Sequence, residues 1–150
     1  MKNLFDLSAV TEIKTRLGAL RPDSQRQWGS MAPAQAIAHC SGGLEMALGD
    51  LNPPRVMIGR LIGRIIKPLA LGDDKPIRKN SPTAKLLIVT DQRDLNTERA
   101  RLASLIDRFT AGGATACTKH PHAFFGPLTP DEWSVLMYKH LDHHLRQFGA

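Results

Sequence analysis

Two imidazoles near the C-terminal end of the sequence, His140 and His144, have the spacing that best suits chemistry. They stand four residues apart in a segment with helical periodicity, and residues at that spacing lie one turn apart on one helix face. Such a pair can bind a single transition-metal ion. A third imidazole, His39, lies in an earlier segment that also has helical periodicity. If these helices face each other, the three side chains form a metal site.

The neighbours of the pair favour an inward position. Residues at steps of three or four make one stripe along the last helix: Trp133, Met137, His140, His144 and Gln147. A buried polar group without a partner costs about 1–3 kcal/mol, and one shared divalent ion would satisfy all three imidazoles. Three histidines without an obvious fourth protein ligand leave a coordination position open, as in catalytic zinc sites. Zinc is the expected ion, and nickel, iron or manganese also accept imidazole ligands.

Several side chains are expected to surround this trio. Gln35 and Met46 share the face of His39 on the second helix, and Gln147 and Trp133 share the stripe of the last helix. Gln35 and Gln147 could orient a metal ligand or a water molecule through hydrogen bonds. Met46 and Trp133 are expected to line the pocket.

The remaining histidines have two interpretations each. His143 flanks the stripe and is expected at its rim. His120 and His122 lie in the loop before the last helix, where they either contact a substrate or are ordinary exposed residues. No general base stands out, because Glu45 and Asp142 point away from the histidine faces, so no catalytic residue is assigned. The histidine pair itself has an ordinary alternative, since the dipole at a helix C-terminus stabilises imidazolium without any ligand.

Helical periodicity and end signals predict an all-α fold for a single domain spanning residues 1–150. Four main helices and one short extra helix are expected, with a long loop from Gly72 to Asp91 between the second and third helices of a four-helix bundle. The expected helices are Leu4 to Leu20, about Ala32 to Leu48, about Arg55 to Ile66, Asp94 or Asn96 to Thr110, and Thr129 to about Phe148.

Five details of these helices and of the long loop are open to test. Ser30 is the expected N-cap of the second helix, Pro68 is expected to end the short third helix, and the glycines at 112 and 113 to end the fourth. Leu86–Val89 is expected to be at most one extended piece of the long loop. Gly42-Gly43, inside the second helix, indicates either close packing against a neighbouring helix or room for a metal shell beside His39.

The third helix carries a broad apolar stripe with a basic edge at Arg60, Arg64 and Lys67. The stripe consists of Met57, Ile58, Leu61, Ile62, Ile65 and Ile66. We expect it to be core with a solvated rim. The alternative is a helix that lies on a membrane surface.

Composition narrows the class of protein. The chain has 150 residues and a net charge of +6, but the basic residues are dispersed, and aromatic content is only 5%, so a nucleic-acid partner is not expected. No apolar run approaches the roughly 20 residues of a membrane span, and no signal peptide is recognised. Two distant cysteines fit a reducing cytoplasm. We therefore expect a cytoplasmic protein without a membrane partner.

Two motifs resemble a known superfamily. Residues 28–40 (WGSMAPAQAIAHC) resemble the second-helix motif of the DinB-like superfamily, and His140-x-x-x-His144 followed by Leu-Arg-Gln resembles its C-terminal metal motif. The whole chain is similar in length and order of elements. Residues 125–149 resemble one branch in particular, a bacterial domain of unknown function.

The resemblance implies a four-helix bundle that holds a divalent metal ion through His39, His140 and His144 at one end. Relatives include thiol-dependent S-transferases and metal-dependent hydrolases, and many are homodimers. This chain departs from the S-transferase branches around the third helix and the loop at 72–91. The leading hypothesis is thus a metalloenzyme that activates water or a small thiol against a small-molecule substrate. Its rivals are a non-catalytic bundle that binds a ligand or a metal, and a basic module that binds membrane or nucleic acid.

Overall fold

The computed structural model describes residues 1–81, 83 and 85–150, and within these residues the chain is helical without a strand. A lone β-bridge joins His122 and Gly126. The elements in chain order are α1 (Leu7–Ala19), α2 (Pro33–Leu48), α3 (Met57–Leu71), the short 3-10 helix η1 (Lys85–Leu87), α4 (Leu95–Ala116) and α5 (Pro130–Gln147). The all-α prediction is therefore confirmed for the described residues.

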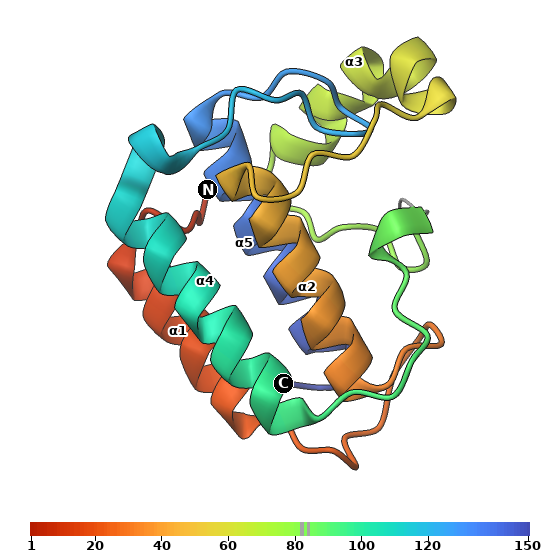
Figure 1. Cartoon of the computed structure of the whole chain (residues 1–150), viewed down its shortest axis with the longest axis vertical. Helices are drawn as coiled ribbons and strands as arrows, with labels where there is room; N and C mark the ends of the chain where they lie inside the picture. Colours follow the sequence, from red (N-terminus) through yellow and green to blue (C-terminus); the bar gives the residue numbers. More distant parts are fainter. Residues whose placement is uncertain (82, 84) are drawn as a thin grey trace.

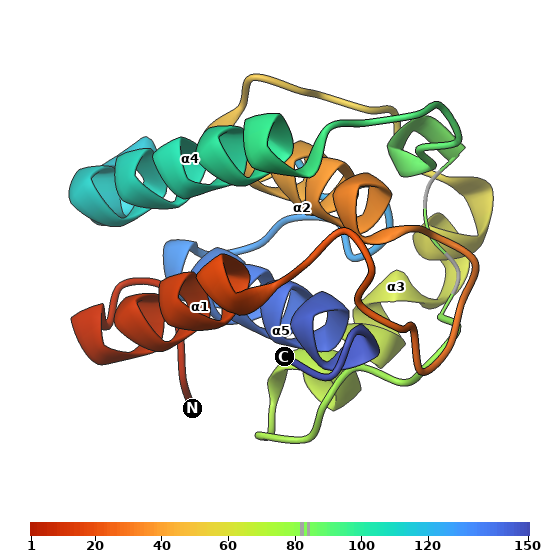
Figure 2. The same cartoon turned by 90° about the horizontal axis from the view of Figure 1, so that it is seen from below.

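Four of the helices, α1, α2, α4 and α5, lie side by side, and α3 stands apart from α1 and α4 (Figures 1 and 2). Helix α2 packs most extensively on α4 and also on α5, while α1 packs on α4 and α5. The centre is filled by large side chains that are almost fully buried, among them Leu4, Ile13, Ile37, Leu44, Phe109 and Trp133. Helices α2 and α5, which carry the three histidines, thus face each other across the core.

Local end signals start α4 and α5 where the sequence predicts, whereas α1 begins at Leu7, three residues after the predicted Leu4. The side chains of Asp6 and Asp94 accept hydrogen bonds from backbone N–H groups in the first turns of α1 and α4. Thr129 and Glu132 form a reciprocal capping box at the start of α5, with Pro130 at the first helical position. These caps satisfy N–H groups that have no partner within the helix.

Ser30 is not the N-cap of α2, contrary to the sequence prediction. The cap is Ala32, which has no side-chain acceptor, and its own N–H donates to Oε1 of Gln35 at 2.9 Å. Gln35 also donates from Nε2 to the carbonyl of Asp91 at 3.1 Å. Gln35 therefore stabilises the start of α2 and ties the chain after η1 to it.

One predicted helix end is also wrong, and another is confirmed only in part. Helix α3 continues through Pro68 to Leu71, on an exposed part of the chain where the carbonyl left without its N–H partner can turn to water. Helix α4 continues past its glycine pair to Ala116, although Gly113 has φ 53° and ψ −145° and interrupts the helical backbone. Pro68 and Gly113 thus each mark an irregularity in the helix, and about one further turn of helix follows each of them.

The long loop at 72–91 was expected to contain at most one extended piece at Leu86–Val89. The structure instead forms the 3-10 helix η1 (Lys85–Leu87), which includes the first two residues of the expected extended piece. Two residues of the predicted loop, 82 and 84, lie outside the described part of the chain. Leu87, at the end of η1, is partly buried and packs against the core beside α2. The loop therefore contributes to the region around His39.

The prediction that the apolar stripe of α3 is core is wrong. Only Gly59, Gly63 and Leu71 of this helix are buried. Leu61 and Ile65, at the centre of the stripe, are 74% and 66% exposed. No helix among the described residues is long and apolar enough to cross a membrane.

Candidate metal centre

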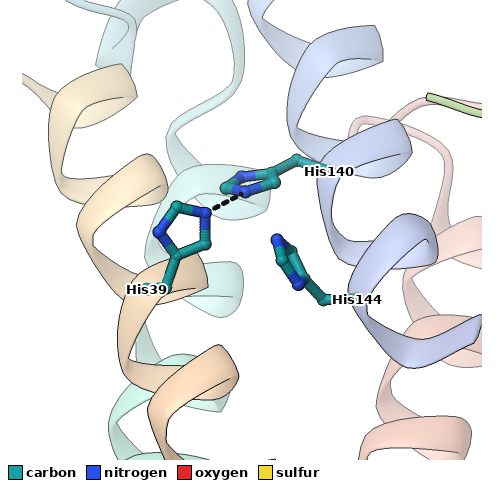
Figure 3. A group of neighbouring side chains, drawn as sticks. All are labelled: His39, His140 and His144. Carbon is teal, nitrogen blue, oxygen red and sulfur yellow. Dashed lines mark hydrogen bonds between the residues drawn. The ribbon is translucent and has the colours of Figure 1, made fainter. Parts of the chain in front are cut away.

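His39 from α2 and His140 and His144 from α5 point their rings toward one another across the interface of these two helices (Figure 3). The ring centroids lie 4.8, 4.8 and 5.0 Å apart, and one ring nitrogen from each residue falls within 4.8 Å of the others. His39 and His144 are buried and His140 is half-buried. The structure thus brings together the three histidines that the sequence singles out.

The ring of His144 is oriented by a relay of hydrogen bonds that ends at a backbone carbonyl. Nε2 of Gln147 donates to the carbonyl of Trp28 at 2.8 Å, which leaves Oε1 of the same amide to accept from Nδ1 of His144, also at 2.8 Å. Since Nδ1 of His144 is then the protonated nitrogen, its Nε2 carries the lone pair. Gln147 therefore fixes the tautomer that a metal ligand needs.

His39 is oriented in the same way from the loop side. Its Nδ1 donates to the carbonyl of Leu87 at 2.8 Å, so its Nε2 carries the lone pair and faces Nε2 of His140 at 2.8 Å. The protonated nitrogen of each ring thus points outward to a protein oxygen, for both His39 and His144. This is the arrangement by which outer hydrogen bonds usually hold metal-binding histidines.

Gly43 makes room for the third ring. It lies one turn after His39 on α2, and a Cβ at this position would stand 2.9 Å from Nδ1 and 3.1 Å from Cε1 of His140. A side chain there would push the imidazole away, so the close approach requires glycine. Gly42 instead faces Leu87, whose Cδ2 would lie 2.8 Å from a Cβ. Gly43 thus leaves room for a ring beside His39, and Gly42 allows close packing against Leu87, so each of the two interpretations of the sequence applies to one glycine.

Burial keeps the three imidazoles neutral. It lowers the pKa of His39, and the hydrogen bond to Leu87 opposes this only in part. Burial, followed by the proximity of His39, lowers the pKa of His144 to about 3. The same two causes hold the pKa of His140 well below its usual range. Neutral imidazole is the form that binds a metal ion, so the environment suits ligation at neutral pH.

The dimensions of the cluster also suit a tetrahedral ion. Nitrogen ligands lie about 2.0–2.1 Å from zinc, which separates two of them by about 3.4 Å. The nitrogens here bracket that value, since the shortest separation is 2.8 Å and all fall within 4.8 Å. Small ring rotations would equalise them. Among residues 1–81, 83 and 85–150, no carboxylate or thiol joins this group, so three imidazoles are the whole donor set.

His143 is buried beside the cluster, with its ring centroid 5.0 Å from that of His144. Its Nδ1 donates to the carbonyl of Ile77 at 3.2 Å, and its Nε2 accepts from the indole N–H of Trp28 at 3.4 Å. Burial lowers its pKa, and the Ile77 carbonyl opposes the shift in part. Both nitrogens are therefore engaged, and His143 connects α5 to the loop at 72–91 and to the segment before α2.

The two loop histidines lie in different environments. His120 is exposed, and its Nε2 lies 3.3 Å from the carbonyl of Pro53. His122 is half-buried, and its Nδ1 accepts the backbone N–H groups of Phe124 and Phe125 at 3.1 and 3.2 Å. Its ring contacts the buried indole of Trp133 at 5.4 Å between centroids. The expected substrate contacts of His120 and His122 remain predictions.

The expected pocket residues on α2 are engaged in the protein itself. Gln35 caps its own helix, as described above, and Met46 is buried in the hydrophobic core. The nearby acids are paired elsewhere: Glu45 with Arg101, and Asp142 with Arg16 and Arg146. The described residues therefore place no free carboxylate at the cluster that could serve as a general base.

Sequence reasoning missed three groups that position His39 in the cluster and His143 beside it. The carbonyls of Leu87 and Ile77 and the indole of Trp28 hold His39 and His143. Backbone carbonyls carry no sequence signal, because every residue has one. Trp28 does have a sequence signal, because it is a tryptophan outside any apolar stripe and it begins the motif at 28–40.

Comparison with known proteins adds one match. The family model described as "Protein of unknown function (DUF1569)" matches residues 2–150. No curated protein and no solved structure matches the chain.

Proposed function

The chain belongs to the DUF1569 family of proteins of unknown function, and we propose from its site that it is a divalent-metal protein whose ligands are His39, His140 and His144. Zinc is the proposed ion, since three neutral imidazoles suit it well; nickel, iron and manganese are the alternatives. The proposal includes the finer fold, a four-helix bundle of the DinB-like type formed by α1, α2, α4 and α5. The observation that carries it is the convergence of one nitrogen from each of three rings, two of which, those of His39 and His144, donate outward to protein oxygens and so carry the lone pair on the inner nitrogen.

Each residue has a defined part in this proposal. His39, His140 and His144 would bind the ion, Gln147 and the Leu87 carbonyl hold two of the rings in the required tautomer, and Gly43 leaves space for the third. A bound divalent ion with an open position supplies Lewis acidity that lowers the pKa of a water molecule or a thiol. The buried surroundings would strengthen that effect by excluding competing solvent.

The chemistry that we favour is transfer or hydrolysis on a small-molecule substrate, with thiol transfer ahead of hydrolysis. Glu45 and Asp142 are held in ion pairs with arginines, so neither is positioned to remove a proton from water. A thiol needs no protein base once the ion has lowered its pKa, because its pKa is already near 8.5. The same observation favours a second candidate, a protein that sequesters a metal or ligand without turnover.

Elemental analysis after zinc reconstitution and desalting tests the metal proposal. We expect one equivalent of zinc for the wild type and well under one equivalent for His144→Ala. His120→Ala is the matched control, since His120 is exposed and lies outside the cluster. A wild type that retains well under one equivalent after reconstitution would remove the proposal, as would equal zinc content in the His144→Ala variant.

Substrate screening then separates an enzyme from a binding protein. The zinc-loaded protein is assayed with ester and amide substrates and with small thiols plus an electrophile. Turnover that disappears in His39→Ala and persists in His120→Ala supports catalysis at the cluster. A zinc-loaded protein that is inactive on every class supports sequestration.

A further inference from the structure

Helix α3 turns its most apolar face to solvent. Six large side chains on one side of this helix are substantially exposed: Met57 (79%), Ile58 (54%), Leu61 (74%), Ile62 (37%), Ile65 (66%) and Leu69 (71%). Single exposed apolar residues are ordinary, but a contiguous patch of this kind usually marks a binding surface. Figures 1 and 2 show α3 at the edge of the molecule.

The outward direction of this face is built into the fold by glycine. Gly59 and Gly63 lie one turn apart on the opposite side of α3 and press against the backbone at Phe124. A Cβ at these positions would stand 2.5 and 2.2 Å from the carbonyl oxygen of Phe124, so no larger residue fits the contact. Nη2 of Arg55 donates to the carbonyl of Gly59 at 2.9 Å and holds the start of the helix. The glycine face is thus fixed inward and the apolar face outward.

The charges on this surface are positive. Helix α3 contains no acidic residue, and Arg60 and Arg64 are exposed along the edge of the apolar face. Beside them lies a hollow of about 680 Å³ with three cationic side chains in its wall, lined by Arg55, Arg64, Lys67, Pro68, Phe125 and Pro127. Lys67 is partly neutralised by Glu132 at 2.8 Å, while no ion pair of Arg60 or Arg64 is found among the described residues. The whole chain carries a net charge of +6.

An apolar face with a cationic edge fits an anionic bilayer better than a second copy of the chain. A symmetric pair through α3 would bring two basic helices together, with no acid on either helix to balance Arg60 and Arg64. At an anionic membrane the same arginines meet lipid phosphates while the apolar side chains enter the acyl boundary. The helix has 15 residues and does not span a membrane, so it would lie in the interface plane.

We propose that α3 is a membrane-docking helix that lies on anionic phospholipid, with Leu61 and Ile65 inserted and Arg60 and Arg64 at the headgroup phosphates. The membrane-surface alternative for this helix ranks second only if the stripe is core, and the stripe is exposed. The proposal does not depend on the metal centre, because α3 carries none of the three histidines, which lie on α2 and α5.

Vesicle co-sedimentation tests the proposal. The full chain is mixed with vesicles of phosphatidylglycerol and phosphatidylcholine, or of phosphatidylcholine alone, at low and high salt. We expect binding to the anionic vesicles that weakens with salt, and little binding to the neutral ones. Absence of binding to anionic vesicles at low salt would overturn the proposal.

Two double variants with matched controls assign the surface. Leu61→Ser with Ile65→Ser should abolish sedimentation, whereas Leu7→Ser, at a 73% exposed position of α1, should not. Arg60→Gln with Arg64→Gln should weaken the partition coefficient by roughly 25-fold, at roughly fivefold for each arginine. The control for charge is Arg21→Gln with Arg26→Gln, which removes the same charge elsewhere on the surface.

Two further outcomes count against the membrane. Binding that survives Leu61→Ser with Ile65→Ser, while circular dichroism shows a folded protein, would place the contact elsewhere. A homodimer in sedimentation velocity that the same double variant converts to monomer, without vesicle binding by the wild type, would assign the face to a second copy of the chain. Either result would overturn the proposal.

Discussion

Gly43→Ala should separate folding from metal binding. The new Cβ would stand 2.9 Å from Nδ1 and 3.1 Å from Cε1 of His140, where ordinary contacts begin near 3.4 Å. The ring must therefore move by about half an ångström, which is the tolerance of a preorganised site. We expect the zinc Kd to rise by about 10- to 100-fold, or about 1.4–2.7 kcal/mol. Alanine also favours helix over glycine by about 1 kcal/mol, so the zinc-free protein should lose little stability.

The assay is a competition titration of zinc against a chromogenic chelator, combined with thermal unfolding of the zinc-free protein. Gly18→Ala is the matched control, because a Cβ at Gly18 in α1 meets nothing within 4 Å. This control should raise the free energy of unfolding by about 1 kcal/mol and leave the zinc Kd unchanged. A Gly43→Ala variant that binds zinc as tightly as the wild type would refute the placement of His140 in the ligand set.

Three more predictions concern Gln147, the effect of zinc on stability, and His122. Gln147→Leu removes the acceptor of His144 Nδ1 and should weaken zinc binding by about 10- to 100-fold in the same titration, and an unchanged Kd would contradict its orienting role. Zinc at 100 times its Kd should stabilise the wild type by about 2.7 kcal/mol in thermal unfolding, and an equal gain in His39→Ala would contradict the site. Burial, with Arg55 nearby, lowers the pKa of His122 to about 4, so the unfolded chain takes up a proton below about pH 6.5 that the folded chain refuses until about pH 4. The contribution of His122 to stability, present in full above pH 6.5, should therefore fall by up to about 3 kcal/mol as the pH drops to 4, in addition to the loss from the other buried histidines, and in denaturant unfolding His122→Asn should reduce the slope by this share.

The elements that the sequence locates well are those with local causes. Asp94 and Thr129 cap their helices through hydrogen bonds within one turn, so their signals survive without knowledge of the fold. The stripe on α5 is also local, and it placed His140 and His144 on the face that meets α2. The start of α2 is instead stabilised by Gln35, a side chain inside the helix that accepts from the N–H of Ala32. The prediction of Ser30 as the cap is therefore wrong.

The elements that the sequence does not locate depend on partners. Periodicity identifies the apolar stripe of α3 but not what packs against the helix. The helix packs through the opposite face, where Gly59 and Gly63 contact the backbone of Phe124, so the stripe is left exposed. The orientation of His39 depends on the carbonyl of Leu87, 48 residues away, and a backbone group leaves no trace in residue type. The candidate ligands were thus predictable from spacing, and the groups that hold them were not.

Anomalous diffraction at the zinc edge, from a crystal of the zinc-loaded protein, tests the central claim most directly. The predicted result is one anomalous peak about 2.0–2.1 Å from Nε2 of His39, His140 and His144. A peak on His120 or His143 instead, or no peak between α2 and α5 in a protein that carries one equivalent of zinc, would contradict it.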